Sequence, residues 1–362
     1  MSVLIVGSVA FDSIETATGS DPRALGGSAT YGSVAASFFS PVSLVGVVGE
    51  DFDQENIDLL AVWDEDEYGG REGAAKHGLD FHEDLDELLA RDDIEAVIVN
   101  AITSDHPKVM IAAAKAGKHI FTEKALAITV AEADTIIEAV DKAGVKFMIS
   151  LPSRSRSGIL LAKKAVEDGL LGDLTFGRAR IAHSAGLDKW FSGPSAWFAD
   201  AERAGGGALF DLGCHVMDIL PWLMGGSPAK ITGFINNQSN AYPIDDNSVT
   251  LMEFPNNAIG VVDCSWVHRS GPALLELYGT EGSLVQGMGD TQLQTRVLDD
   301  DARDAFLANA PDNLPSAMDQ WVNAILNDAP MTITIQDGRN LTEVMEAVYR
   351  ASSTGQAVSL PL

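Results

Sequence analysis

The chain has 362 residues, of which 52 are acidic and 24 basic, so its formal net charge at pH 7 is -28. This charge repels phosphate backbones and anionic lipid surfaces, which disfavours nucleic acids and membranes as partners. A hydrophobic content of 46% and a charged content of 21% exclude disordered and fibrous classes, and the length predicts two domains.

The first 150 residues alternate between predicted strands and helices. Polar turns are expected from the first strand to residue 27, then a helix over 28–39 and a strand over 42–48. Buried strands are predicted at 3–9, 60–63, 96–100, 119–122 and 146–150, and helices at 68–76, 85–90, 106–116 and 130–143. This alternation predicts a Rossmann-like parallel sheet with helices on both faces, hence an α/β domain.

The pattern changes after residue 150, where several strands follow one another. Helices are predicted at 159–167 and 208–224, and strands at 231–236, 248–253, 259–266 and 273–278. Successive strands without intervening helices predict a mostly antiparallel sheet, so the second domain is expected to be α+β. The expected division is an atypical start at 1–60, the rest of a nucleotide-binding domain at 61–125, a boundary at 126–150 and a substrate domain at 151–362.

Lys124 follows the strand predicted at 119–122, so it lies at the carboxyl end of a sheet strand, where open α/β sheets bind ligands. A lysine there can act as an acid or a base. Glu123 and Lys124 could equally be an ordinary surface pair.

Three glycines at 205–207 precede a predicted helix that carries Asp211 and His215. Glycines let a backbone approach a ligand, and residues four apart share a helical face. A carboxylate beside an imidazole can orient a hydroxyl and move its proton. No third ligand has a diagnostic spacing, so a metal is not expected; a structural helix start with a buried histidine is the alternative.

Several further side chains could contact a ligand. Trp190 and Trp197 could stack on sugar rings, and Arg154 could meet a polar ligand, although packing or surface roles are equally open. Asp64 ends the strand predicted at 60–63, where an acid can accept both ribose hydroxyls of NAD and would repel the 2′-phosphate of NADP.

From about residue 61 to the end, the chain resembles the glucose-fructose oxidoreductase and inositol dehydrogenase family (Gfo/Idh/MocA). The resemblance rests on 61–64 (AVWD), 92–100, 116–124 (ending in Glu-Lys), 205–215 and 358–362. The family's Glu-Lys-Pro motif is Glu-Lys-Ala here, so the proline is lost. The resemblance implies a catalytic trio of Lys124, Asp211 and His215. It also implies that Asn100, Thr103, His106 and Glu123 lie along the cofactor.

The first 60 residues lack the G-x-G-x-x-G turn that should open such an enzyme. They resemble instead the start of a PfkB/ribokinase-type sugar kinase, which would make Asp12, Gly26 and Gly27 sugar contacts. The chain would then be a splice that lost its first dehydrogenase strand, with 42–48 as the candidate replacement. The late Gly-Ala-Gly-Asp segment of these kinases is absent, which argues against kinase activity.

The predicted function is transfer of a hydride between NAD, less favourably NADP, and a hydroxyl-bearing carbon of a sugar or polyol. A sugar-binding pseudo-enzyme without a working cofactor site is the main alternative, and a sugar kinase is the weaker one. Two cysteines exclude a disulfide framework, and we expect a cytoplasmic homo-oligomer.

Overall fold

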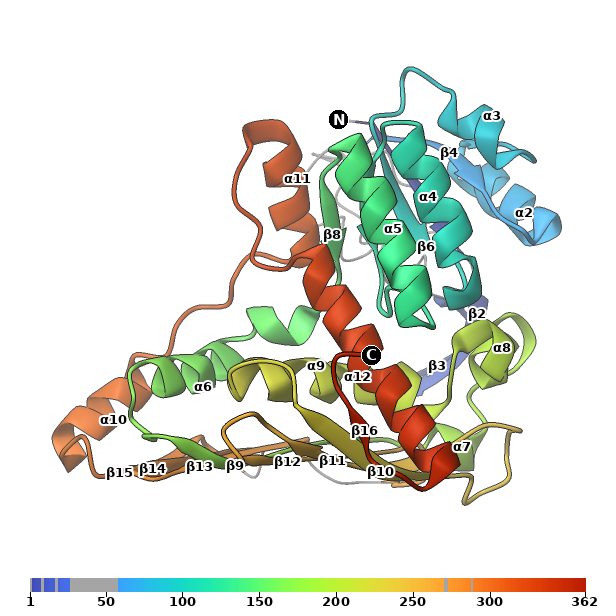
Figure 1. Cartoon of the computed structure of the whole chain (residues 1–362). Helices are drawn as coiled ribbons and strands as arrows, with labels where there is room; N and C mark the ends of the chain where they lie inside the picture. Colours follow the sequence, from blue (N-terminus) through green and yellow to red (C-terminus); the bar gives the residue numbers. More distant parts are fainter. Residues whose placement is uncertain (1, 8–9, 17–18, 27–57, 270–272, 288) are drawn as a thin grey trace. The chain divides into compact units, whose positions relative to one another are not determined.

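The computed structural model describes the chain except residues 1, 8–9, 17–18, 27–57, 270–272 and 288 (Figure 1). The chain divides into two units. The first contains Met1–Ser150, Phe191–Trp197 and Pro315–Arg339, and the second contains Leu151–Trp190, Phe198–Leu314 and Asn340–Leu362. Two stretches from the range expected to form the substrate domain therefore belong to the first unit.

The first unit is built on a six-stranded sheet in the order β5-β4-β1-β6-β7-β8, whose paired strands are all parallel. The strands are β1 (Ser2–Gly7), β4 (Asp58–Trp63), β5 (Asp80–Phe81), β6 (Ala96–Asn100), β7 (His119–Thr122) and β8 (Phe147–Ile149). All five residues of β6 are buried, as expected for a central parallel strand.

Helices pack against this sheet, and α4 and α5 lie side by side (Figure 1). The helices of this unit are α2 (Glu67–His77), α3 (Leu85–Leu89), α4 (His106–Lys115), α5 (Val130–Ala143) and α11 (Ala317–Asn327), with a short 3₁₀ turn η1 (Thr103–Asp105). Helix α5 begins with a capping box between Thr129 and Glu132 and ends at Gly144, which has a φ of 66°. These local signals explain why its predicted bounds are correct.

The start of the chain differs from the expectation. Strand β1 pairs with both β4 and β6, so residues 2–7 supply the central strand that the sequence analysis took to be lost. The polar turns expected next are an antiparallel hairpin of β2 (Ala10–Thr16) and β3 (Gly19–Gly26), because pairing satisfies backbone groups even where side chains are polar. The predicted elements at 28–39 and 42–48 lie outside the described residues.

The second unit contains an eight-stranded sheet in the order β15-β14-β13-β9-β12-β11-β10-β16. Its paired strands are antiparallel except β9 and β12. The strands are β9 (Leu174–Ala182), β10 (Lys230–Asn236), β11 (Asn247–Glu253), β12 (Ile259–Ser265), β13 (Leu274–Gly279), β14 (Gly282–Gln286), β15 (Gln292–Thr295) and β16 (Val358–Ser359). The expected combination of a parallel α/β sheet and a mostly antiparallel α+β sheet is confirmed.

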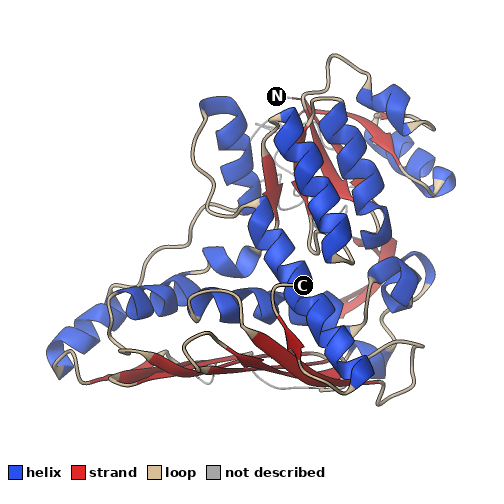
Figure 2. Ribbon diagram, in the orientation of Figure 1, coloured by secondary structure: helices blue, strands red, loops and turns tan. Residues whose placement is uncertain are grey.

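Helices of the second unit lie over one face of this sheet (Figure 2). They include η2 (Pro152–Ser155), α6 (Ser157–Glu167), α7 (Ala185–Asp188), α8 (Ala201–Ala204), η4 (Leu209–Gly213), α9 (Cys214–Leu223) and α10 (Asp300–Ala308). The long helix α12 (Ile335–Thr354) contributes residues to both units, and η3 (Gly193–Ala199) crosses their boundary in sequence. Helix α9 and η4 pack on β9 and β12, which fixes the segment that carries Asp211 and His215.

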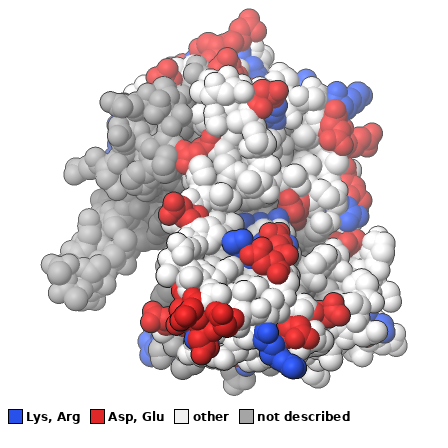
Figure 3. All heavy atoms as spheres, turned by 90° about the vertical axis from the view of Figure 1, so that its left-hand side faces the viewer, with Lys and Arg blue, Asp and Glu red and all other residues white. Residues whose placement is uncertain are grey.

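Acidic side chains gather in several separate groups on the face drawn in Figure 3, with fewer basic ones among them. On α10, for example, Arg303 pairs with Asp300 and Asp304. This dispersal fits a solvated acidic surface.

Candidate active site

Four of the predicted site residues lie at the carboxyl edge of the parallel sheet in the first unit. Asp64 follows β4, Asn100 ends β6, and Glu123 and Lys124 follow β7. Strand β1 runs between β4 and β6, with Gly7 in register with Asn100. Because neighbouring parallel strands end at the same edge, the fold brings these residues to the place where open α/β sheets bind ligands.

The segment that carries Lys124 is held by Thr122, whose hydroxyl lies 3.2 Å from the oxygen of Val99 and 3.1 Å from that of Glu123. Burial raises the pKa of Glu123, while the charge of Lys124 and a hydrogen bond from Ser150 oppose the shift. Lys124 itself is half-buried. A partly desolvated ammonium beside a carboxyl group can hold a polar ligand more strongly than a fully hydrated lysine can.

His106 is buried, with 1% of its surface exposed. Its Nδ1 lies 3.2 Å from the oxygen of Leu126 and its Nε2 lies 3.1 Å from the oxygen of Ala101. Burial lowers the pKa of His106, against the effect of these carbonyl groups, so the neutral ring is favoured. His106 thus links the loop after β6 to the loop after β7, and its predicted place beside a cofactor remains a proposal, as does that of the buried Thr103.

Asp64 has an unusual electrostatic setting. Burial, with the charges of Asp66 and Glu65, raises its pKa to about 7, although its Oδ1 accepts a hydrogen bond of 2.9 Å from the backbone N–H of Asp66. Nearby, Lys108 pairs with Glu65 at 2.8 Å. The local charge around Asp64 is therefore negative, and Lys108 is already paired with Glu65.

In the second unit, Asp211 lies in the π-helix η4 and His215 in the first turn of α9. From residue 209 to 221, only Asp211, Leu212 and His215 have partly exposed side chains, and the others are buried. A π turn takes i to i+5 hydrogen bonds and occurs frequently at functional sites. One accessible strip of a buried helix therefore carries both predicted residues.

The fold itself requires the three glycines before this helix. Gly205 has a φ of 89°. A Cβ on Gly206 would lie 2.0 Å from the hydroxyl of Tyr349, and one on Gly207 would lie 1.9 Å from the backbone oxygen of Asp245. The close approach that Gly206 and Gly207 allow is to the protein itself, and not to a ligand as their sequence pattern predicts.

Arg154, predicted as a substrate contact, has a structural partner. Its Nε and Nη2 donate to Asp218 at 2.7 to 3.1 Å, and the two side chains are 9% and 2% exposed. Asp218 lies on α9, three residues after His215. This buried ion pair fixes α9, and any contact of Arg154 with substrate remains a prediction.

The two predicted aromatic contacts differ in exposure. Trp190, in the second unit, is 53% exposed and stacks on His183 with 4.8 Å between ring centroids. Trp197, in the first unit, is 7% exposed. Exposure therefore favours Trp190 as a sugar-stacking side chain, while burial indicates packing for Trp197.

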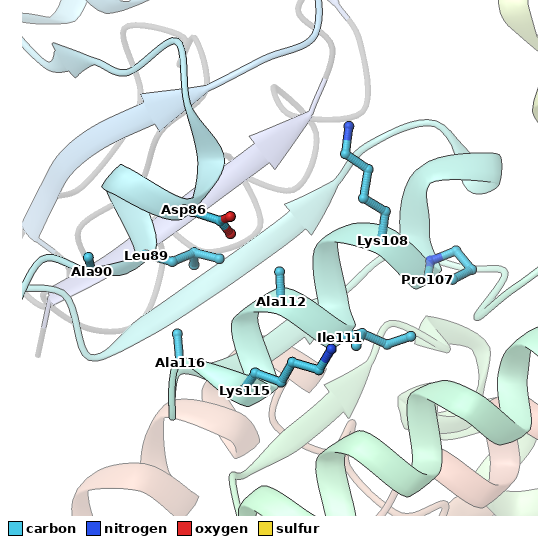
Figure 4. A pocket seen from close by; sticks show the side chains of 9 residues that line it. All are labelled: Asp86, Leu89, Ala90, Pro107, Lys108, Ile111, Ala112, Lys115 and Ala116. Atoms are coloured by element: carbon cyan, nitrogen blue, oxygen red, sulfur yellow. The ribbon is translucent and has the colours of Figure 1, made fainter.

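A shallow hollow of about 630 Å³ lies between α3 and α4 (Figure 4) and contains none of the predicted site residues. Its lining is Asp86, Leu89, Ala90, Pro107, Lys108, Ile111, Ala112, Lys115 and Ala116.

Among the described residues, no group of three or more His, Cys, Asp or Glu side chains could hold a metal ion. In the same part of the chain, no helix combines the length and the apolar character needed to cross a membrane.

Comparison with known proteins gives two family matches. The NAD-binding Rossmann-fold model of the GFO/IDH/MocA oxidoreductases matches residues 45–151, and the GFO/IDH/MocA C-terminal domain model matches residues 159–285. The chain belongs to the Gfo/Idh/MocA family of oxidoreductases. This agrees with the resemblance found in the sequence.

Two relatives and one solved structure illustrate the match. The chain is 28% identical over 243 residues to 2,7-anhydro-N-acetylneuraminate hydratase of Mediterraneibacter gnavus, covering 66% of this chain and 63% of that protein. It is 30% identical over 220 residues to levoglucosan dehydrogenase of Pseudarthrobacter phenanthrenivorans, covering 54% and 56%. The matches thus span less than two thirds of these two relatives. A structure of levoglucosan dehydrogenase with NADH and levoglucosan shares the fold, with a TM-score of 0.75, 21% identity and 100% coverage of both chains.

These comparisons do not support the sugar-kinase resemblance of residues 1–60. The match to the NAD-binding model begins at residue 45, inside that segment. Of the predicted kinase contacts, Asp12 lies in β2 and Gly26 in β3, while Gly27 lies outside the described residues. With β1 in the central position of the sheet, a lost first strand is no longer needed to explain the chain.

Proposed function

We propose that this family member is an NAD-dependent dehydrogenase that oxidises a secondary hydroxyl of a sugar or polyol. The proposal depends mainly on the accessible strip formed by Asp211 and His215 on an otherwise buried helix. Lys124, at the carboxyl edge of the parallel sheet, completes the proposed catalytic trio. The names of the relatives, which include a levoglucosan dehydrogenase and myo-inositol and scyllo-inositol dehydrogenases, support the substrate class.

Each member of the trio has a distinct proposed role. The imidazole of His215 takes the hydroxyl proton, because histidine titrates near neutral pH. By the family resemblance, the Nζ of Lys124 stabilises the negative charge that develops on the hydroxyl oxygen. The carboxylate of Asp211 accepts hydrogen bonds from neighbouring hydroxyls and so orients the ring. NAD, when bound, supplies the hydride acceptor.

The residues of the first unit fit a dinucleotide. Asp64 at the end of β4 suits the ribose hydroxyls, and Asn100, Thr103, His106 and Glu123 lie at or beside the ends of the neighbouring strands β6 and β7. The negative surroundings of Asp64 favour NAD over NADP, because a 2′-phosphate would be repelled. Isothermal titration of the full chain with NAD, using ATP as the control ligand, tests this fit. Micromolar binding followed by NADH absorbance with a panel of sugars and cyclitols is expected; a folded protein that binds no NAD would favour the pseudo-enzyme.

The preference for NAD over NADP should depend on pH. Because the pKa of Asp64 is about 7, its carboxyl group is mostly protonated at pH 6 and mostly ionised at pH 8. Repulsion of a 2′-phosphate therefore grows as pH rises. Between pH 6 and pH 8 we expect the dissociation constant for NADP, divided by that for NAD, to increase roughly tenfold. Asp64→Asn is the control, because in this variant the carboxyl group no longer titrates and only the 2′-phosphate of NADP does. An equal pH trend in wild type and variant would contradict this role.

The raised pKa of Asp64 also has a defined effect on stability. The folded chain binds this proton more tightly than the unfolded chain, so the contribution of Asp64 to stability is present below about pH 4 and is lost as pH rises toward 7. Asp64→Asn should remove this component from the pH dependence of urea unfolding.

We also propose that the chain forms a homo-oligomer through the sheet face of the second unit that the described helices leave uncovered. Exposed apolar side chains line it from four strands: Phe234, Val249, Leu251, Ile259 and Tyr278. Patches of this kind mark interaction surfaces. Light scattering should give a multiple of the 38.3 kDa chain mass, and a monomer at micromolar concentration would contradict the proposal.

A further inference from the structure

Asp245, in the second unit, lies where the glycine run meets the helix that carries Asp211 and His215. Its carboxylate accepts hydrogen bonds from the backbone N–H of Gly207 at 2.8 Å, from that of Leu209 at 3.2 Å and from the hydroxyl of Tyr349 at 2.9 Å. Its backbone oxygen accepts a fourth, from the N–H of Ala208 at 2.9 Å. Asp245 therefore binds three consecutive residues at the start of the helix.

At two of these glycines the attachment leaves no room for a side chain. A Cβ on Gly207 would lie 1.9 Å from the backbone oxygen of Asp245, and one on Gly206 would lie 2.0 Å from the hydroxyl of Tyr349. Neither position has room for a side chain, so the glycine backbone lies close to Asp245 and Tyr349. A shift of Asp245 alone would break its hydrogen bonds to residues 207–209.

The hydrogen bonds continue from this run into the predicted active site. The N–H of Asp211 donates to the oxygen of Gly207 at 2.9 Å, and the π-helix η4 leads directly into α9 and His215. We propose that Asp245 is a positioning residue that sets Asp211 and His215 through Gly207 and Leu209. Its relevance to turnover rests on the function proposed above.

The electrostatics of Asp245 agree with this arrangement. Burial raises the pKa of Asp245, and the three donors oppose the shift. Burial and the charge of Asp245 raise the pKa of Tyr349 well above its usual value, so its phenol keeps the proton that it donates. An asparagine at 245 would turn one acceptor into a donor, so at least one of the three donors would face an N–H group.

Asp245→Asn in the full chain tests the proposal without requiring activity. The ¹H NMR titration curve of His215, assigned with His215→Gln, should differ between the variant and the wild type, since the imidazole changes its surroundings. If the protein turns over a sugar or polyol, kcat should fall about 10- to 100-fold with little change in KM. A loss of packing alone would not produce this combination.

Asp246→Asn is the matched control. Asp246 is adjacent, 2% exposed, and accepts from the backbone N–H groups of Gln238 at 2.7 Å and Ser239 at 2.8 Å, away from the helix. The Asp246→Asn substitution should destabilise the second unit and leave the titration of His215 unchanged. Should Asp245→Asn fail to fold, Tyr349→Phe removes one donor and should give a smaller shift of the same kind.

An unchanged His215 titration in the folded variant, or an equal shift in the Asp246 control, would overturn the proposal. A shift confined to Asp245→Asn supports it. If that shift occurs while the wild type oxidises no sugar or polyol, the positioning role stands and the proposed function fails, so the two failures are distinguishable.

Discussion

Replacing Lys124 by alanine is expected to lower kcat by about 10²- to 10⁴-fold, the range typical of a lost acid–base group, while the protein stays folded. Lys124 is half-buried and follows β7, so loss of its side chain should leave the sheet intact. We expect the free energy of unfolding to change by less than about 1 kcal/mol. The measurement is NADH formation with the best substrate of the panel, beside urea unfolding of the same samples.

Two further variants separate chemistry from packing at this position. Lys124→Met keeps the apolar stem and removes only the charge, so it should be as inactive as the alanine variant. Lys115→Ala, on the exposed end of α4, removes a lysine of the same unit outside the proposed site and should retain activity. Turnover of the Lys124 variants within twofold of wild type would remove Lys124 from the mechanism.

The sequence predicted best those elements whose signals are local. Strand β6 matches its predicted bounds because its first four residues form an unbroken apolar run. Helix α5 matches because Thr129 and Gly144 mark its two ends. Helix α12 was not predicted, although Leu341, Val344, Met345 and Val348 have helical spacing and are buried. The polar residues between these positions weaken the apolar pattern of α12.

The candidate site was predicted in part. The spacing of Asp211 and His215 predicts a shared helical face, and the structure leaves both side chains partly exposed on an otherwise buried segment, while their catalytic role stays a prediction. Asp245 could not be found in this way, because it contacts Gly207, 38 residues earlier in the chain. A glycine run in a sequence indicates a close approach, but only the fold identifies what approaches. Here it is Asp245 and Tyr349.

The second large effect is expected from breaking the buried ion pair between Arg154 and Asp218. Arg154→Met leaves the carboxylate of Asp218 without its guanidinium partner in a site where it is 2% exposed. Removing one partner of a buried pair costs about 3–5 kcal/mol, which should appear as a large decrease in the free energy of urea unfolding. Lys164→Met, in the exposed pair with Asp168, is the control and should cost about 1 kcal/mol at most.

A double replacement, Arg154→Met with Asp218→Leu, distinguishes stability from function at this position. Removing both charges should restore most of the lost stability, since an apolar pair can replace a buried ion pair at little cost. Restored stability with kcat still low would mean that α9 requires the bidentate geometry to hold His215, three residues before Asp218. Full recovery of both stability and kcat would make the ion pair purely structural. If Arg154→Met lowers the free energy of unfolding no more than Lys164→Met does, burial of the pair is not what makes it stabilising.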